Sequence, residues 1–308
     1  MTRWDGSDIP DMSGKTAIVT GGNCGLGFES ARALADKGAQ VILACRSLDK
    51  GEAAVQEISR LSPAVLPRVM QLDLQDLRSV SGFTRSFRAD FDRLDLLMNN
   101  AGIMNTPYGL TEDGFERQMG TNHLGHFALT GQLLEFLRKT PGSRVVTVSS
   151  SGHRAGRMQF EDLLFEGGKR YTPLKAYGRS KLANLLFAYE LQRHFERHGI
   201  DCASVAAHPG ASQTNLGRHI EDGRFFRLFK PILGRVVQGA DRGALPQIRA
   251  SVDPEVRGGE YYGPDGSFEM SGYPIAVRSS KASRSLRDAQ RLWQESERLT
   301  GVRYGFTS

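Results

Sequence analysis

Short apolar runs alternate with longer amphipathic stretches up to about residue 210, and this alternation constrains the fold more than any other feature. Helical spacing occurs at 26–37, 49–61, 77–89, 114–138 and 174–198, between strand-like runs at 16–20, 40–44, 68–72, 94–98, 144–149 and 201–207. Strands that alternate with helices form parallel sheets with helices on both faces. The runs AIV, VIL and RVVTV are nearly all apolar, as expected of strands covered on both sides.

The remaining residues extend the same domain. Helices are expected at 240–250 and 283–299, and a last edge strand at 260–262. Because no repeat, linker or low-complexity tract divides the chain, the sequence predicts a single doubly wound α/β domain over residues 1–308. The prediction is a three-layer Rossmann domain with a mostly parallel, seven-stranded sheet.

Two segments break the alternation, an insert at 151–173 and a stretch at 211–238 that contains FFRLFKPILGRVV. Loops at the carboxyl ends of strands bind the ligand in doubly wound folds, so we expect 211–238 to be a lid over a substrate. Contact of this segment with a membrane surface is the alternative. Pro231 and Gly234, which interrupt a long amphipathic helix, favour the lid.

Composition excludes several classes of protein. Lys and Arg (40 residues against 34 Asp and Glu) are spread along the chain without the basic run of a nucleic-acid tail. Cys24, Cys45 and Cys202 are widely spaced, which indicates reduced thiols and neither a disulfide framework nor a metal site. The N-terminal residues are polar, and no apolar stretch is long enough to span a membrane, so we expect a cytoplasmic protein.

A glycine-rich turn connects the first predicted strand to the first predicted helix. Gly21, Gly25 and Gly27 have the spacing T-G-x-x-x-G-x-G. Glycine lets a pyrophosphate approach the backbone, and the following helix presents free N–H groups and a positive dipole end to it. The turn therefore predicts a dinucleotide site, although such glycine spacing also occurs in ordinary flexible turns.

The end of the second predicted strand indicates which dinucleotide is bound. NAD-binding proteins usually place a carboxylate there for the ribose 2′-hydroxyl, whereas this strand ends in Cys45 and Arg46. A guanidinium binds the 2′-phosphate of NADP(H) through charge-assisted hydrogen bonds. We therefore expect NADP(H); the alternative is that Arg46 is a surface residue paired with Asp49.

Tyr177 and Lys181 stand one helical turn apart in YGRSK. Positions i and i+4 share a helix face, so both side chains can point into one cleft. A tyrosine has an ordinary pKa of about 10, and a nearby ammonium lowers it towards the range useful for proton transfer. The pair predicts acid–base chemistry, but tyrosine and lysine at this spacing also occur as a plain surface pair.

Several ordered motifs together resemble the short-chain dehydrogenase/reductase family over nearly the whole chain. They are TGGNCGLG at 20–27, LDL at 72–74, NNAG at 99–102, TNHLG at 121–125, VTVSS at 146–150, YGRSK at 177–181 and HPG at 208–210. TNHLGHF and SSSGH are most similar to the retinol dehydrogenase branch, with some similarity to light-dependent protochlorophyllide reductases. Members of the family often dimerise through the helices corresponding to 114–138 and 174–198, so a homodimer or homotetramer is expected.

The resemblance implies four catalytic residues. Ser150 would hydrogen-bond the substrate carbonyl, and Tyr177 would protonate it. Lys181 would hold the nicotinamide ribose and lower the tyrosine pKa, and Asn122 would kink its helix and hold a water that supplies protons. Ser149 or Ser151 could be the serine instead, and Asn122 could simply satisfy backbone groups.

The same resemblance implies the residues around NADP(H). These are Thr20, Gly21, Asn23, Gly25, Leu26, Gly27, Arg46, Asp73, Leu74, Asn99, Ala101, Gly102, Tyr177, Lys181, Pro209, Gly210 and Thr214. The expected reaction is the interconversion of an aldehyde or ketone and its alcohol, on a hydrophobic substrate of retinoid, steroid or lipid type. Reduction of a carbon–carbon double bond, and NADP(H) binding without turnover in a sensor or scaffold, are the alternatives.

Overall fold

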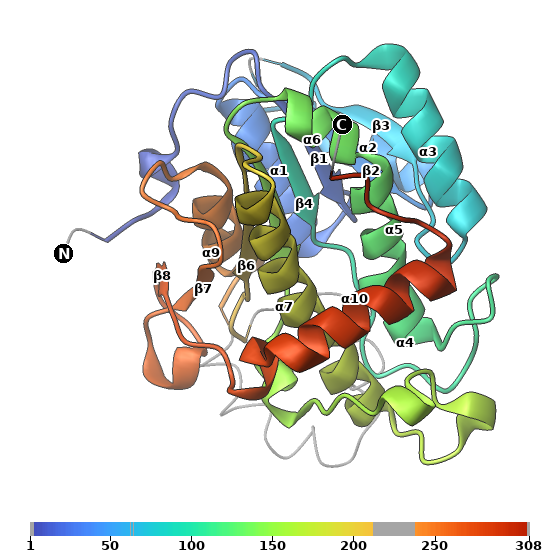
Figure 1. Cartoon of the computed structure of the whole chain (residues 1–308). Helices are drawn as coiled ribbons and strands as arrows, with labels where there is room; N and C mark the ends of the chain where they lie inside the picture. The colour runs from blue at the N-terminus through green and yellow to red at the C-terminus, as the bar shows by residue number, and fades with distance from the viewer. Residues whose placement is uncertain (1–2, 62, 64, 212–237, 307–308) are drawn as a thin grey trace.

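A computed structural model describes residues 3–61, 63, 65–211 and 238–306 (Figure 1). Its centre is one sheet with the strand order β3-β2-β1-β4-β5-β6-β7-β8. The first seven strands are parallel, and β8 pairs antiparallel with β7. The predicted doubly wound α/β fold is confirmed, but the predicted number of strands is wrong, since the described residues form eight strands instead of seven.

The strands lie close to the predicted runs. Their bounds are Thr16–Thr20 (β1), Gln40–Cys45 (β2), Arg68–Gln71 (β3), Leu96–Asn99 (β4), Ser143–Val148 (β5), Cys202–Ala207 (β6), Tyr261–Pro264 (β7) and Pro274–Ala276 (β8). The unpredicted strand β8 has three residues and begins with a proline, which cannot donate to a sheet ladder and is tolerated at an edge. Such a segment has too few residues to show strand periodicity.

The helices also follow the predicted stretches, except in one place. They are Gly25–Asp36 (α1), Leu48–Ser59 (α2), Leu77–Asp90 (α3), Pro173–Arg197 (α7), Ala240–Val252 (α9) and Leu286–Thr300 (α10). The single helix predicted at 114–138 is divided instead into Arg117–Met119 (α4), a π-helical turn Gly120–Leu124, Gly125–Gln132 (α5) and Leu134–Lys139 (α6).

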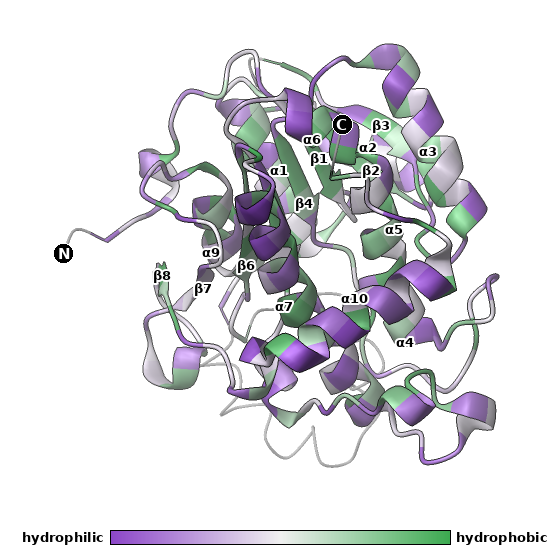
Figure 2. Ribbon diagram, viewed as in Figure 1, coloured by the Kyte–Doolittle hydropathy of each residue, from purple (hydrophilic) through white to green (hydrophobic). Residues whose placement is uncertain are grey.

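Alternate residues of β1 face two separate apolar cores. Ala17 and Val19 face a core with residues of α1, α2 and α9, whereas Ile18 faces a core with residues of α3, α5, α7 and α10. Apolar strands therefore lie between helices whose outer faces are hydrophilic (Figure 2). No helix in the described part of the chain has both the length and the hydrophobicity to cross a bilayer.

Helix α10 and the residues after it cover the outer face of α5 and α7 (Figure 1). The Trp293 and Phe187 rings stack with centroids 5.8 Å apart, and the Tyr304 hydroxyl donates to the Phe127 carbonyl at 2.7 Å. Every residue of 176–188 is buried as a result. The chain's own α10 thus covers part of the face at which the subunit interface is expected, and the homodimer or homotetramer stays a prediction.

Candidate active site

An open cavity of about 310 Å³ lies where β1, β4, β5 and β6 end. Its walls come from the glycine turn, the loop after β4, the ends of two further strands, and α7. The lining residues are Gly21 and 24–27, then 100–104 and Thr106, then Val148, Ser149 and Pro209, and finally Tyr177 and Lys181. The carboxyl edge of the sheet thus brings the glycine turn and the tyrosine–lysine pair to one cavity.

The glycine turn has the features that a dinucleotide phosphate requires. Gly21 has a φ of +65°, and a Cβ on Gly27 would overlap the Gly21 carbonyl oxygen, so side chains are excluded from both positions. Cys24 is the N-cap residue of α1, and its side chain caps none of the first N–H groups. These N–H groups are therefore available to an anion, and the turn fits the pyrophosphate of a nicotinamide dinucleotide.

Arg46 is exposed directly after β2, at the beginning of the loop that leads into α2. None of the ion pairs found among the described residues joins it to Asp49. Ser47 accepts a hydrogen bond from the Lys50 N–H and caps α2. The guanidinium is therefore free of the partner considered from the sequence.

Tyr177 and Lys181 are both buried on α7 and both face the cavity. The Lys181 ammonium donates to the Val148 carbonyl at 3.0 Å and lies 5.9 Å from the centroid of the Tyr177 ring. Burial lowers the pKa of Lys181 to about 8. Burial also raises the pKa of Tyr177, and a hydrogen bond with Ser150 offsets only part of that rise. Burial therefore shifts the tyrosine pKa in the direction opposite to the one expected from the lysine alone.

The three consecutive serines have different surroundings. Ser149 is buried and donates to the Lys181 carbonyl at 2.8 Å, so its hydroxyl is already engaged in the backbone of α7. Ser150 accepts from the Gly152 N–H at 3.1 Å and is the serine that hydrogen-bonds Tyr177. Ser151 begins a 3₁₀ turn that leads away from β5. Ser149 lines the cavity and Ser150 adjoins Tyr177, so the choice of Ser150 stays a prediction.

Asn122 lies inside the π-helical turn, at the place where the predicted long helix is interrupted. Its side-chain oxygen accepts from the Ile103 N–H at 2.8 Å, and its side-chain nitrogen donates to the Ile103 carbonyl at 3.0 Å and to Ser180 at 2.9 Å. The amide therefore connects the loop after β4 to α7. It does satisfy backbone groups, as the alternative stated, and it does so at the cavity wall.

Some residues expected beside the cofactor lie elsewhere. Asn99 is buried, and its side-chain nitrogen donates to Thr130 of α5 at 3.0 Å, so its side chain faces the core instead of the cavity. Asp73 accepts from the Gln75 N–H, and Leu74 is buried in the core. Neither lines the cavity. Thr214 and most of the predicted lid lie outside the described residues.

The remaining residues that were expected around the cofactor lie near the glycine turn and near the end of β6. Thr20 is buried under the turn, Asn23 is half-buried within it, and Gly210 follows the lining residue Pro209 with a φ of +66°. They adjoin lining residues of the cavity without lining it themselves.

Comparison with known proteins identifies the family. A model of the short chain dehydrogenase family matches residues 15–224. The chain belongs to this family. It is 39% identical to retinol dehydrogenase 12 of Mus musculus over 95% of this chain and 88% of that one. It is also 39% identical to retinol dehydrogenase 11 of Homo sapiens, over 94% and 87%.

Solved structures agree with this assignment. A protein of Mycobacterium paratuberculosis superposes with a TM-score of 0.81 at 42% identity, covering 98% of this chain and 99% of that one. Pseudomonas aeruginosa RhlG, solved with NADP, superposes with a TM-score of 0.68 at 21% identity, covering 84% and 98%. The second likeness concerns the fold alone.

In this short-chain dehydrogenase the insert at 151–173 is fixed to α7 by Arg179, which lies between the tyrosine and the lysine. The Arg179 guanidinium is 3% exposed and stacks on the Phe165 ring, with its central carbon 3.8 Å from the ring centroid. It donates to the carbonyls of Asp162 at 2.6 Å and Leu163 at 2.8 Å, and to the Gln159 side chain at 2.9 Å. Sequence reasoning missed this role, because an arginine inside a helix motif gives no sign of its distant partners.

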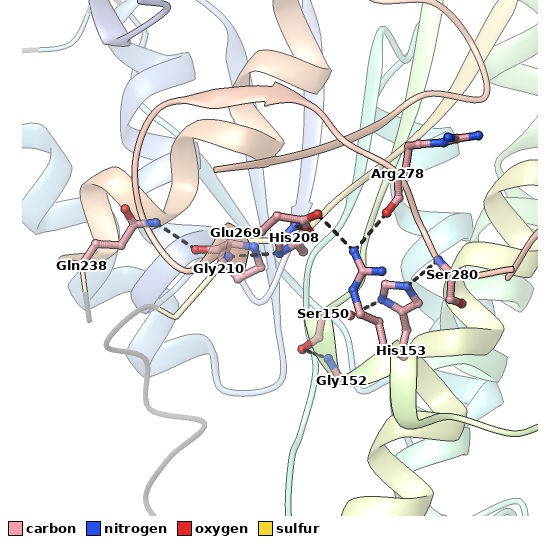
Figure 3. A network of polar contacts seen from close by, with 11 residues as sticks. Ser150, Gly152, His153, His208, Gly210, Gln238, Glu269, Arg278 and Ser280 are labelled. Atoms are coloured by element: carbon pink, nitrogen blue, oxygen red, sulfur yellow. Dashed lines mark hydrogen bonds and ion pairs between the residues drawn. The ribbon is translucent and has the colours of Figure 1, made fainter. Parts of the chain in front are cut away.

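A second set of contacts that the sequence did not reveal fixes the backbone of Ser150 through His153 (Figure 3). His153 Nδ1 donates to the Ser150 carbonyl at 2.6 Å, and His153 Nε2 accepts from the Ser280 N–H at 3.1 Å. Burial lowers the pKa of His153 to about 4, so the ring is neutral at physiological pH. The ring thereby connects Ser150 to the residues that follow β8.

Glu269 lies beside His208, close to the start of the segment at 211–238 (Figure 3), and Arg154 pairs with it. Arg154 donates to Glu269 at 3.1 Å, and the other Glu269 oxygen lies 3.0 Å from His208 Nε2, although the N–H direction is poor for a hydrogen bond. The contact with His208, followed by that with Arg154, lowers the pKa of Glu269. Gln238 donates to the Pro209 carbonyl at 2.9 Å, so both ends of the segment are anchored beside the cavity.

Proposed function

We propose that this short-chain dehydrogenase is an NADP(H)-dependent oxidoreductase that interconverts a hydrophobic aldehyde or ketone and its alcohol. One observation carries the proposal: the Tyr177 and Lys181 side chains line the same cavity as the glycine turn. Membership of the family and the identity to retinol dehydrogenases support oxidoreductase chemistry on an alcohol or carbonyl group.

Tyr177, Lys181 and the neighbouring Ser150 have distinct tasks in this reaction. Ser150 orients the substrate oxygen by a hydrogen bond, and Tyr177 gives that oxygen a proton. Lys181, whose pKa burial brings to about 8, exchanges protons near neutral pH more readily than an exposed lysine does. A nicotinamide dinucleotide bound beside Tyr177 and Lys181 would supply or accept the hydride, and the positive charge of its oxidised ring would favour the tyrosinate.

The preference for NADP(H) rests on Arg46. A guanidinium at the end of β2, unpaired with Asp49, suits the extra phosphate of NADP(H), and no carboxylate stands at that position to bind the 2′-hydroxyl of NAD(H). The hydrophobic substrate is supported by the apolar residues Leu26, Ile103, Met104 and Val148 in the cavity wall. A cytoplasmic location is part of the proposal and agrees with three free cysteines.

The deciding experiment measures NADPH oxidation by the purified protein with retinal and a panel of apolar aldehydes and ketones. We expect Tyr177→Phe to lower kcat by about 100-fold or more, because a proton donor is lost, and to change the Kd for NADPH by less than about threefold. Tyr189→Phe is the matched control, because Tyr189 lies on the same helix and its hydroxyl donates to Ser279 outside the cavity. Its kcat should stay within about twofold.

Other outcomes point to other functions. NADPH binding without turnover on any panel member would identify a sensor or scaffold, and saturation of the double bond of an enal would identify a double-bond reductase. For the cofactor, Arg46→Ala should reduce the preference for NADPH over NADH by about tenfold or more. Arg60→Ala, at the opposite end of α2, should not change it.

A further inference from the structure

A buried histidine connects the glycine turn to the π-helical turn. His126 lies on α5 and is 1% exposed. Its Nδ1 is 3.0 Å from the backbone carbonyl oxygen of Asn122, and its Nε2 is 2.9 Å from the hydroxyl of Thr20. The ring therefore contacts the residue that begins the glycine turn and the residue whose amide fixes the cavity wall.

The direction of each hydrogen bond follows from its partner. A carbonyl oxygen only accepts, so Nδ1 must carry the hydrogen and donate to Asn122. Burial lowers the pKa of His126 to about 4, so the ring is neutral and Nε2 has a free lone pair. The Thr20 hydroxyl therefore donates its proton to Nε2, although the Met98 carbonyl at 3.3 Å is a second, longer acceptor.

The Thr20 oxygen then has only accepting capacity left, and two backbone groups use it. The N–H groups of Asn100 and Ala101 both lie 2.9 Å from this oxygen. Asn100 and Ala101 line the cavity on the side of the glycine turn. These hydrogen bonds form a series that runs from the loop after β4 through Thr20 and His126 to Asn122. Each donor in the series faces an acceptor, so reversing the direction of one bond would leave another polar atom unpaired.

We propose that His126 is a positioning residue with two separable tasks: through Nε2 it shapes the cofactor side of the cavity, and through Nδ1 it sets the Asn122 carbonyl on the catalytic side. This inference rests on the proposed function. It assigns a role to the second histidine of TNHLGHF that the catalytic groups alone do not require. The two tasks are carried by different ring nitrogens, so substitutions that keep one nitrogen's bond distinguish them.

The test uses two substitutions and one control. In His126→Asn the amide nitrogen lies near the place of Nδ1 and keeps the bond to Asn122, whereas in His126→Gln the amide oxygen reaches the place of Nε2 and keeps the bond from Thr20. His123→Gln is the control, because His123 is equally buried in the π-helical turn but contacts Ser296 of α10. His123→Gln should change neither kcat nor the Kd for NADPH by more than about twofold.

We expect opposite effects of the two substitutions. His126→Asn should raise the Kd for NADPH, measured by its fluorescence, by about tenfold and leave kcat within about threefold. His126→Gln should lower kcat by about tenfold and leave that Kd within about threefold. Equal effects on both parameters in the two variants, or an equal effect of His123→Gln, would overturn the proposal, because they would indicate general loss of packing.

Two readouts remain if the protein reduces no carbonyl and the proposed function fails. The Kd for NADPH still reports the task of Nε2. Amide hydrogen exchange of the π-helical turn reports the task of Nδ1, and it should become at least about fivefold faster in His126→Gln than in His126→Asn. Equal exchange in the two variants refutes the role of Nδ1 independently of any enzymatic activity.

Discussion

Replacing Arg179 by methionine should destabilise the protein far more than a surface substitution does. The guanidinium is buried between α7 and the insert at 151–173, and it is the donor for the carbonyl oxygens of Asp162 and Leu163. Methionine has a similar length and fills part of the same space, but it donates no hydrogen bond. The carbonyl of Leu163, a residue that is only 6% exposed, would lose its donor in a place where water replaces it poorly.

The magnitude follows from the individual contacts. Hydrogen bonds to a charged donor contribute about 1.5–3 kcal/mol each, and stacking on Phe165 contributes about 1–2 kcal/mol. Burial lowers the pKa of Arg179, which means that the charged group carries a desolvation cost that methionine removes. Water also reaches the more exposed Gln159 and Asp162, so we expect a net loss of about 3 kcal/mol in unfolding free energy.

Urea unfolding followed by tryptophan fluorescence measures this loss. Arg291→Met is the matched control, because Arg291 also approaches the insert: it pairs with Glu161 at 3.2 Å and lies 4.5 Å from the Phe160 ring. Arg291 is only half-buried and its partner Glu161 is exposed, so its replacement should cost less than about 1 kcal/mol. Equal losses in the two variants would refute the reasoning that burial makes Arg179 the anchor of the insert.

Three further outcomes are expected. Because burial lowers the pKa of Lys181 from 10.5 to about 8, Lys181→Met should stabilise the cofactor-free protein by up to about 3 kcal/mol at pH 7. That gain should vanish in urea titrations as the pH rises from 8 to 10.5. Burial lowers the pKa of His123 to about 3, so the unfolded chain binds its proton first as the pH falls. Between pH 6.5 and 3, the unfolding free energy of His123→Phe should therefore fall by about 1.4 kcal/mol per pH unit less than that of the unsubstituted protein. Urea unfolding at pH 4.5 and 7.5 would reveal this difference. A Cβ on Gly125 would lie 2.5 Å from the Leu74 carbonyl oxygen, whereas Gly82 has open space. The midpoint temperature of thermal unfolding should therefore be lowered by Gly125→Ala and raised slightly by Gly82→Ala.

The layered fold could be predicted because buried parallel strands consist almost entirely of apolar and β-branched residues. Every residue of β1 is buried, and its run of apolar and β-branched residues is visible without knowing its neighbours. The π-helical turn around Asn122 could not be predicted in the same way. One extra residue in a helical turn hardly changes the apolar spacing of a stretch of 25 residues, so 114–138 was predicted as one helix.

The candidate site also contains residues that the sequence predicts and residues that it does not. Tyr177 and Lys181 were predicted together because one helical turn fixes their relation. The roles of Arg179 and His126 depend on partners that only the fold brings near, such as Thr20, which is 106 residues from His126. The side-chain direction of Asn99 could not be predicted, because the strand before the NNAG motif continues through this residue and turns its side chain towards Thr130.

The C-terminal covering of α5 and α7 has a consequence for synthesis. The hydrogen bond between Tyr304 and Phe127 spans 177 positions, and Trp293 belongs to the same core as the central strands. A nascent chain that has emerged from the ribosome only as far as α7 would therefore carry a sheet whose aromatic core is open to water on one side. The fold is completed only when residues 286–306 have emerged and docked on α5 and α7.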